Sequence, residues 1–320
     1  MKALVARSQN EVKFEEISEL PSNDVLVDVA YSSLNYKDGL AVTGRGRIIR
    51  KFPMVVGIDL AGTVVQSASR EFKVGDRVVG HGNGLGEMDW GGYAPQQRVR
   101  AGAIVKIPDG LTIEESMRLG TAGFTAMLCV LMLEQNEVKP SDREIVVTGA
   151  GGGVGSIAVH LLAQLGYRVA ASTGRAELHD YLRELGATSV ISREELIGKG
   201  PLQSERWAGG VDTVGGETLA NIYAQTAYDG AIACCGMAQS HELHTTVWPL
   251  ILRNVSLLGA SSMHTPMPRR LAAWKRLASD IDHDKLAMMS RTEPLSKIFE
   301  LSEEILAGKV RGRIVIDVNA

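Results

Sequence analysis

Residues 144–156 read Glu-Ile-Val-Val-Thr-Gly-Ala-Gly-Gly-Gly-Val-Gly-Ser, and this stretch decides the fold. Its apolar start predicts a buried strand, and apolar residues at helical spacing from Val154 to Leu165 predict a helix directly after the glycines. A glycine turn between a strand and a helix N-terminus lets backbone N–H groups approach a pyrophosphate, because no Cβ stands in the way. The glycines follow G-x-x-G-x-x-G and not the strict G-x-G-x-x-G spacing. In this context the stretch predicts a dinucleotide site contacted by Gly151, Gly152, Gly153 and Val154.

The residue pattern differs between the first part of the chain and the part that contains this loop. From about Thr121, helical patterns alternate with short apolar strands, expected over 145–148, 169–172, 189–191, 211–214, 231–235 and 256–258. This alternation predicts an α/β fold with a doubly wound parallel sheet, which is a Rossmann domain. Residues 1 to about 120 instead carry short β segments broken by Gly, Pro and Asp, which predict a small barrel-like domain. A Gly-centred turn and a last strand over 309–317 can return to that first domain and make it discontinuous.

Composition limits the class of protein. The 320 residues have a formal net charge of −3, so we expect no nucleic-acid partner. We see no uninterrupted run of about 18 apolar residues and expect no membrane span. The three cysteines form no C-x-x-C pair and are too few for a disulfide framework. This pattern is typical of a cytoplasmic protein.

The end of the second strand indicates which nucleotide is bound. An NAD site usually has Asp or Glu there to bond the ribose 2′-OH, whereas this strand ends in Thr173-Gly174-Arg175. A guanidinium and hydroxyl groups suit a 2′-phosphate, so we expect NADPH. Arg193, after the third strand, is a second candidate for the adenine side. The alternatives are that Arg175 is a surface residue beside Glu177, and that Arg193 is a solvated charge.

Several longer strings carry a family resemblance. The chain resembles the medium-chain dehydrogenase/reductase superfamily over its full length, and more narrowly its quinone-oxidoreductase-like branch, through Ser33–Asp38, Gly57–Val64, Gly75–Val78 and Gly120–Ala126. Within that branch it resembles the NADPH-dependent acryloyl-CoA reductase family at Thr121–Leu128, Asp212–Gly215 and Ile251–Val255. The resemblance implies a GroES-like β-barrel catalytic domain over 1–120 with 288–320, and a Rossmann NADPH-binding domain over 121–287. It also implies a homodimer and cofactor contacts at Leu243 and Ser261.

Metal ligands are missing at the positions where the resemblance would place them. Zinc-dependent alcohol dehydrogenases of this superfamily have a Cys near residues 35–38 and a Gly-His-Glu in place of Gly57-Ile58-Asp59. They also carry four Cys in a structural lobe, which this chain lacks. We therefore expect a metal-free site, without the Lewis acid that stabilises an alkoxide. Reduction of an electron-poor C=C bond needs none, because the carbonyl or thioester spreads the developing charge.

The segment Asn35-Tyr36-Lys37-Asp38 follows a strand where the family's active site begins, and it holds the candidate catalytic residues Asn35, Tyr36 and Asp38. Tyr36 could contact the cofactor or donate a proton, or it could use its hydroxyl structurally. Asp38 is expected to orient Lys37 or Tyr36. The resemblance implies hydride transfer to the β-carbon of acryloyl-CoA, giving propanoyl-CoA.

A CoA substrate needs partners for its phosphates. Arg45, Arg47 and Arg50 lie in a stretch whose charges are all positive, and Trp90, in a glycine-rich loop, could form a wall of the acyl pocket. A solvated basic loop is the alternative explanation of the arginines. Two other functions remain open, an NADPH quinone or enone oxidoreductase and a non-catalytic NADPH-binding protein.

Overall fold

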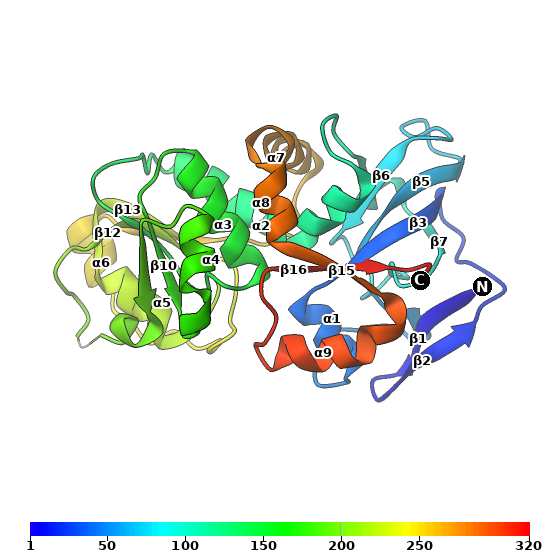
Figure 1. Ribbon diagram of the computed structural model, residues 1–320, viewed down its shortest axis with the longest axis horizontal. Coiled ribbons are helices and arrows are strands. Elements are labelled where there is room, and N and C mark those ends of the chain that lie inside the picture. The colour runs from blue at the N-terminus through cyan, green and yellow to red at the C-terminus, as the bar shows by residue number, and fades with distance from the viewer. Residues whose placement is uncertain (199) are drawn as a thin grey trace. The chain divides into compact units, whose positions relative to one another are not determined.

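The computed structural model describes residues 1–198 and 200–320, and these residues form two compact units (Figure 1). The first unit comprises Met1–Phe124, Ser262–Ser279 and Leu286–Ala320, and the second comprises Thr125–Ser261 and Asp280–Lys285. This division differs from the boundaries expected from sequence, which placed residues 262–279 in the nucleotide domain. The reason is that side chains of helix α7 (Met267–Asp280) are hydrogen-bonded to the β structure of the first unit.

The first unit is built from two antiparallel-rich sheets. A three-stranded sheet has the order β2-β1-β4, with β1 Lys2–Ser8, β2 Glu11–Glu16 and β4 Met54–Val55. The larger sheet has the order β15-β16-β3-β5-β6-β8, with β7 also paired to β3. Its strands are β3 Val25–Leu34, β5 Asp59–Ser67, β6 Arg77–His81, β7 Gln96–Val99, β8 Ile104–Lys106, β15 Ser290–Pro294 and β16 Arg313–Asp317. Inward-facing Leu4, Val27, Leu60, Val78 and Ile314 belong to one buried core.

The last strand returns to the first unit as expected. β16 lies antiparallel to β3, with Ile314 opposite Leu34 and Asp317 opposite Tyr31. The helices of this unit include α1 Tyr36–Val42 and α9 Ile298–Leu306, whereas α8 His283–Met288 begins in the second unit and ends in the first. The pairing of β16 brings the C-terminal segment beside the strand that leads into α1.

The second unit is the expected Rossmann sheet. Six parallel strands have the order β11-β10-β9-β12-β13-β14, which in chain order is 3-2-1-4-5-6. The strands are β9 Ile145–Val147, β10 Val169–Thr173, β11 Ser189–Ser192, β12 Trp207–Asp212, β13 Thr226–Cys234 and β14 Ser256–Gly259. The helices are α3 Gly153–Gln164, α4 His179–Glu184, α5 Gly216–Ala224 and α6 Trp248–Arg253. The predicted doubly wound α/β fold is confirmed.

One helix bears on the expectation that the chain has no membrane span. Helix α2 (Ile113–Gln135) has an 18-residue window of mean hydropathy 1.5, which is long and apolar enough to cross a membrane by composition alone. The expectation counted only unbroken apolar runs, and Gly123 and Thr125 interrupt this one. In the structure 78% of that window is buried and the helix is kinked at Gly120, so α2 is a buried core helix.

Candidate functional site

The glycine loop has the geometry that a pyrophosphate requires. Gly149 has φ +58°, a left-handed conformation that glycine adopts without strain, and a Cβ there would collide with the Thr213 hydroxyl. A Cβ on Gly155 would collide with the Gly149 carbonyl, so the third glycine lets helix α3 start close against the turn. Gly152 is the N-cap of α3, and a Cβ there would lie 3.3 Å from the Gly149 carbonyl oxygen. These residues fit a dinucleotide phosphate at the helix N-terminus.

Two arginines lie near the end of the second strand. The Arg175 backbone N–H donates to Thr173 Oγ1 at 3.1 Å, and its Nη2 donates to the Gly151 carbonyl at 3.3 Å. The guanidinium therefore links the end of β10 to the glycine loop. A Cβ on Gly174 would lie 2.9 Å from Arg193 Cδ, so the exposed Arg193 side chain covers that glycine. The structure thus brings together five of the predicted cofactor residues, Gly151, Thr173, Gly174, Arg175 and Arg193, and their contact with NADPH stays a prediction.

Two further predicted cofactor residues lie past neighbouring strands. Leu243 is exposed in the segment after β13, and Ser261 lies two residues beyond the end of β14. Both therefore follow the carboxyl ends of parallel strands, where ligands bind in such sheets. Their roles as cofactor contacts stay predictions.

In the first unit, two buried carboxylates share one amide. Asn35 Nδ2 donates to Asp59 Oδ2 at 2.9 Å and to Asp38 Oδ2 at 3.1 Å. Asp38 also accepts from the backbone N–H groups of Asn35 and Ile58, at 2.9 Å each. Asp38 forms part of the capping box at the start of α1. The expectation that Asp38 orients Lys37 or Tyr36 was wrong for Lys37, which pairs with Glu87 at 2.7 Å.

Asp59 is the centre of this network. Its carboxylate accepts from Ser33 Oγ at 2.5 Å and from the backbone N–H and hydroxyl of Thr121, at 3.0 and 2.5 Å. Arg313 Nη2 lies 4.0 Å from Asp59 Oδ2 and donates to Ser33 Oγ at 2.8 Å. Arg313 Nη1 donates to Asn35 Oδ1 at 3.2 Å, which fixes the orientation of the amide.

The pKa values follow from this burial. Desolvation raises the pKa of Asp38 to about 7, with the nearby charge of Asp59 as the second cause. Burial lowers the pKa of Arg313, although both carboxylates oppose that shift. Burial also raises the pKa of Tyr93 well above its usual range, and its hydroxyl donates to the Ser33 carbonyl at 3.0 Å. The cluster thus contains one basic group, Arg313, and two acidic groups, Asp38 and Asp59.

Asp59 and Arg313 are site residues that sequence reasoning missed. Asp59 was considered only as the residue standing where a zinc ligand would be, and Arg313 only as part of a returning strand. A charged residue flanked by apolar ones on a strand was the available signal, since such a residue is buried only when paired.

Tyr36 is placed differently from its neighbours. It is the first residue of α1, and it is 49% exposed while Asn35 and Asp38 are buried. The capping network therefore fixes the backbone that carries Tyr36 and leaves the phenol ring accessible. Its role in catalysis stays a prediction.

The residues predicted to contact CoA are spread over the first unit. Arg45 Nη2 pairs with Glu303 at 2.8 Å, and both side chains are more than half exposed. Arg47 and Arg50 are exposed. Trp90 is half-buried, and its indole N–H donates to the Pro53 carbonyl at 3.1 Å. The structure gives Trp90 a packing role and leaves the CoA contacts as predictions.

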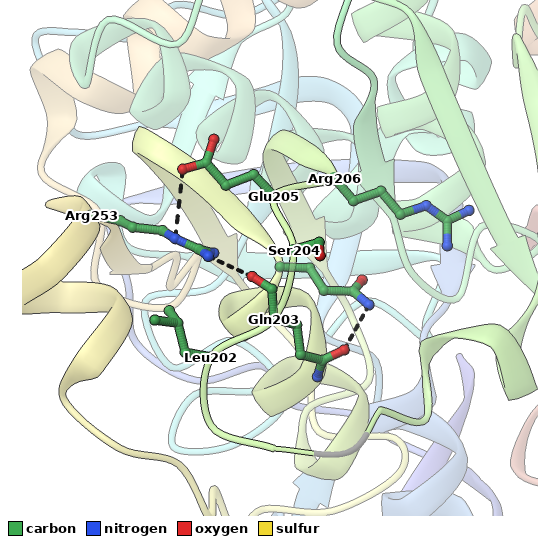
Figure 2. A pocket seen from close by; sticks show the side chains of 7 residues that line it. Leu202, Gln203, Ser204, Glu205, Arg206 and Arg253 are labelled. Carbon is green, nitrogen blue, oxygen red and sulfur yellow. Dashed lines mark hydrogen bonds and ion pairs between the residues drawn. The ribbon is translucent and has the colours of Figure 1, made fainter.

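The described part of the second unit has an open pocket of about 900 Å³, shown in Figure 2. Several of the polar groups that line it form hydrogen bonds or ion pairs with one another. Arg253 donates to the Gln203 carbonyl at 2.5 Å and lies 3.6 Å from Glu205, and Gln225 donates to Gln203 at 3.1 Å. The pocket lies by Arg206, at the amino end of β12, opposite the strand ends that carry the glycine loop. It is therefore separate from the predicted nucleotide site.

Within residues 1–198 and 200–320, no group of three or more His, Cys, Asp or Glu side chains is placed to hold a metal ion. The Cys, His and Glu ligands noted above as missing are absent from the sequence itself.

Comparisons with known proteins place the chain among dehydrogenases. Two family models match, the alcohol dehydrogenase GroES-like domain over residues 21–109 and the zinc-binding dehydrogenase over residues 153–279. The acrylyl-CoA reductase AcuI of Ruegeria pomeroyi is 48% identical, covering 98% of this chain and 96% of the relative. The crystal structure of Escherichia coli K-12 YhdH with bound NADPH is 47% identical, with a TM-score of 0.96 over all of both chains. That of Bacillus subtilis yhfP with NAD bound is 41% identical, with a TM-score of 0.94 over 99% and 98% of the two chains.

Proposed function

Since this chain belongs to the medium-chain dehydrogenase/reductase superfamily, we propose that it is a zinc-free, NADPH-dependent reductase that converts acryloyl-CoA to propanoyl-CoA in the cytoplasm. The observation that carries the proposal is the 48% identity to an acrylyl-CoA reductase over nearly the full length of both chains. The glycine loop and the arginines at the end of β10 support the choice of cofactor.

The reaction needs a hydride at the β-carbon of the thioester and a proton at its α-carbon. NADPH, when bound, supplies the hydride. The chain supplies binding and orientation: Asp38, Asp59 and Arg313 hold the Asn35 amide rigid, and with it the start of α1. Tyr36 then presents its hydroxyl from a fixed backbone, where it can contact the cofactor or donate the proton. In this proposal Arg45, Arg47 and Arg50 bind the phosphates of CoA.

The substrate is tested by the rate of NADPH oxidation, followed by absorbance, with acryloyl-CoA, crotonyl-CoA and benzoquinone as acceptors. We expect acryloyl-CoA to give by far the highest kcat/KM. A preference for benzoquinone would favour the alternative quinone or enone reductase. Equal rates with all three, or none with any, would remove the thioester assignment.

Removal of the Arg175 guanidinium should change the choice between nucleotides. A charge-assisted contact with the 2′-phosphate contributes about 1.5–3 kcal/mol, so Arg175→Ala should raise KM for NADPH about 10- to 100-fold. KM for NADH should stay the same, because NADH has no 2′-phosphate. Arg183→Ala is the matched control, since Arg183 is exposed on the neighbouring helix and pairs with Asp180. An equal effect on both nucleotides would exclude Arg175 from the 2′-phosphate site.

A second copy of the chain is the proposed partner. β14 is the last strand of the parallel sheet, and an open strand edge offers unpaired backbone groups to another strand. The adjoining surface carries exposed apolar side chains, namely Val247, Trp248, Leu250, Ile251, Leu252 and Leu257. A patch of this kind on a soluble protein usually marks an interaction surface. These features support a homodimer that pairs through β14.

Sedimentation velocity tests the dimer. Leu257→Glu places a charge on β14 and should convert the dimer to a monomer at micromolar concentration, because the carboxylate would be buried without a partner. Val74→Glu is the control, since Val74 is an exposed apolar residue of the first unit. A wild-type monomer, or a Leu257→Glu dimer as stable as the wild type, would contradict the proposal.

A further inference from the structure

A buried polar cluster lies in the first unit, apart from the residues to which the proposed reaction gives a role. His81, the last residue of β6, and Trp274, on α7, are both fully buried. The indole Nε1–H of Trp274 donates to His81 Nε2 at 2.9 Å. An indole nitrogen can only donate, so His81 Nε2 is the acceptor and its hydrogen is on Nδ1. Burial lowers the pKa of His81 well below its usual range, which keeps the ring neutral.

Arg270, also on α7, brings a charge into this cluster. Its side chain is fully buried, and its Nη2 donates to the backbone carbonyls of His81 and Ala103 at 2.8 and 3.3 Å. The guanidinium carbon lies 5.9 Å from the centre of the Phe124 ring, and the His81 ring is centred 4.2 Å from the same ring. Burial lowers the pKa of Arg270 to about 10, so the group still carries its charge at neutral pH.

The donors of this cluster outnumber its acceptors. Arg270 Nε, Arg270 Nη1 and His81 Nδ1 have no hydrogen-bond partner among the described residues. In that same part of the chain no carboxylate pairs with Arg270, and burial alone accounts for its pKa. A buried charge without a counter-charge costs several kcal/mol, and each unsatisfied buried donor adds about 1–3 kcal/mol.

We propose that Arg270 and His81 form the binding site of a small monovalent anion, such as chloride. An anion accepts hydrogen bonds from unsatisfied donors of this cluster and neutralises the guanidinium. Water can accept from the same donors, but it carries no charge and therefore leaves the guanidinium without a counter-charge. The ion would bind α7 to the β structure around His81, where the Asn83 backbone N–H also donates to the Met263 carbonyl at 2.7 Å.

The direct test is crystallography of the wild-type protein grown in sodium bromide, with data collected at the bromine absorption edge. We expect an anomalous peak within hydrogen-bond distance of the Arg270 guanidinium. A water molecule at that position, no density there, or bromide at surface positions only would each overturn the proposal. The measurement does not depend on reductase activity, so it stands or falls separately from the proposed function.

A solution test uses the linkage between binding and stability. Replacing sodium gluconate by sodium chloride at constant ionic strength should raise the Tm of the wild type by about 3 °C, because chloride binds only the folded protein. Arg270→Met should abolish this rise. Lys275→Met should retain it, since Lys275 is an exposed cation on the same helix. Equal chloride effects in wild type and Arg270→Met would overturn the proposal, and if Arg270→Met fails to fold, the bromide experiment decides alone.

Discussion

Replacement of Arg313 by methionine is expected to lower the free energy of unfolding by about 3–5 kcal/mol, because it leaves buried acidic groups without their cation. Methionine has nearly the length of the arginine stem, so the loss is electrostatic more than steric. Asp59 and Asp38 would then share a dry site in which Asn35 is the remaining side chain that donates to both. Urea-induced unfolding, followed by tryptophan fluorescence, measures the change.

The matched control is Arg70→Met. Arg70 is exposed in the same unit, and a surface substitution of this kind changes stability by less than about 0.5 kcal/mol. An Arg313→Met protein as stable as the control would show that the carboxylates do not depend on Arg313. Asp59→Asn combined with Arg313→Met should recover part of the loss, since the double variant removes one of the two acids together with the cation.

The second large effect is a dependence of stability on pH that originates at Asp38. Its folded-state pKa of about 7 lies above the ordinary value of 3.8. Between pH 3.8 and about pH 7 the carboxyl group of Asp38 is therefore protonated in the folded protein and ionised in the unfolded chain. Asp38 therefore contributes to the free energy of unfolding in a pH-dependent way. Its contribution is fully present below about pH 4 and is lost as the pH rises to 7, which lowers the free energy of unfolding by about 4 kcal/mol.

The measurement compares the free energy of unfolding at pH 5 and pH 8. The wild type should lose about 3 kcal/mol more than Asp38→Asn between these values, because asparagine does not titrate. Asp38→Asn is less stable at pH 5, since its amide cannot accept from the Ile58 N–H while also accepting from Asn35. Parallel pH profiles for the two proteins would show that Asp38 stays ionised throughout.

The sequence predicted those features that depend on local pattern. The glycine loop, the alternating strands and the returning strand at 313–317 were all visible, because periodicity and turn residues determine them locally. The placement of α7 was not visible, since its position depends on contacts with His81 that are far away in sequence. The residue pattern of this 14-residue helix does not indicate which strand it contacts.

The polar network at the start of α1 was only half predictable. Asn35 and Asp38 stand out in a motif, whereas their partners Asp59 and Arg313 lie on strands 24 and 278 residues away from Asn35. Strand register brings the three segments together, and no single-sequence pattern encodes register between distant strands. For the same reason Asp38 could be placed in the site together with Asn35, whereas its hydrogen bond from the Ile58 N–H could not be predicted.

The kink of α2 at Gly120 has a consequence for the protein's freedom to change. A Cβ at this position would lie 2.6 Å from Asp59 Oδ2 and 2.8 Å from Arg313 Nη2, and φ is +50°. Any side chain would have to displace a charged group and adopt a backbone conformation that L-residues avoid. We therefore expect that neither natural evolution nor directed evolution can replace Gly120, even where neighbouring residues of α2 vary. Libraries built to broaden the acceptor range should therefore keep this codon constant.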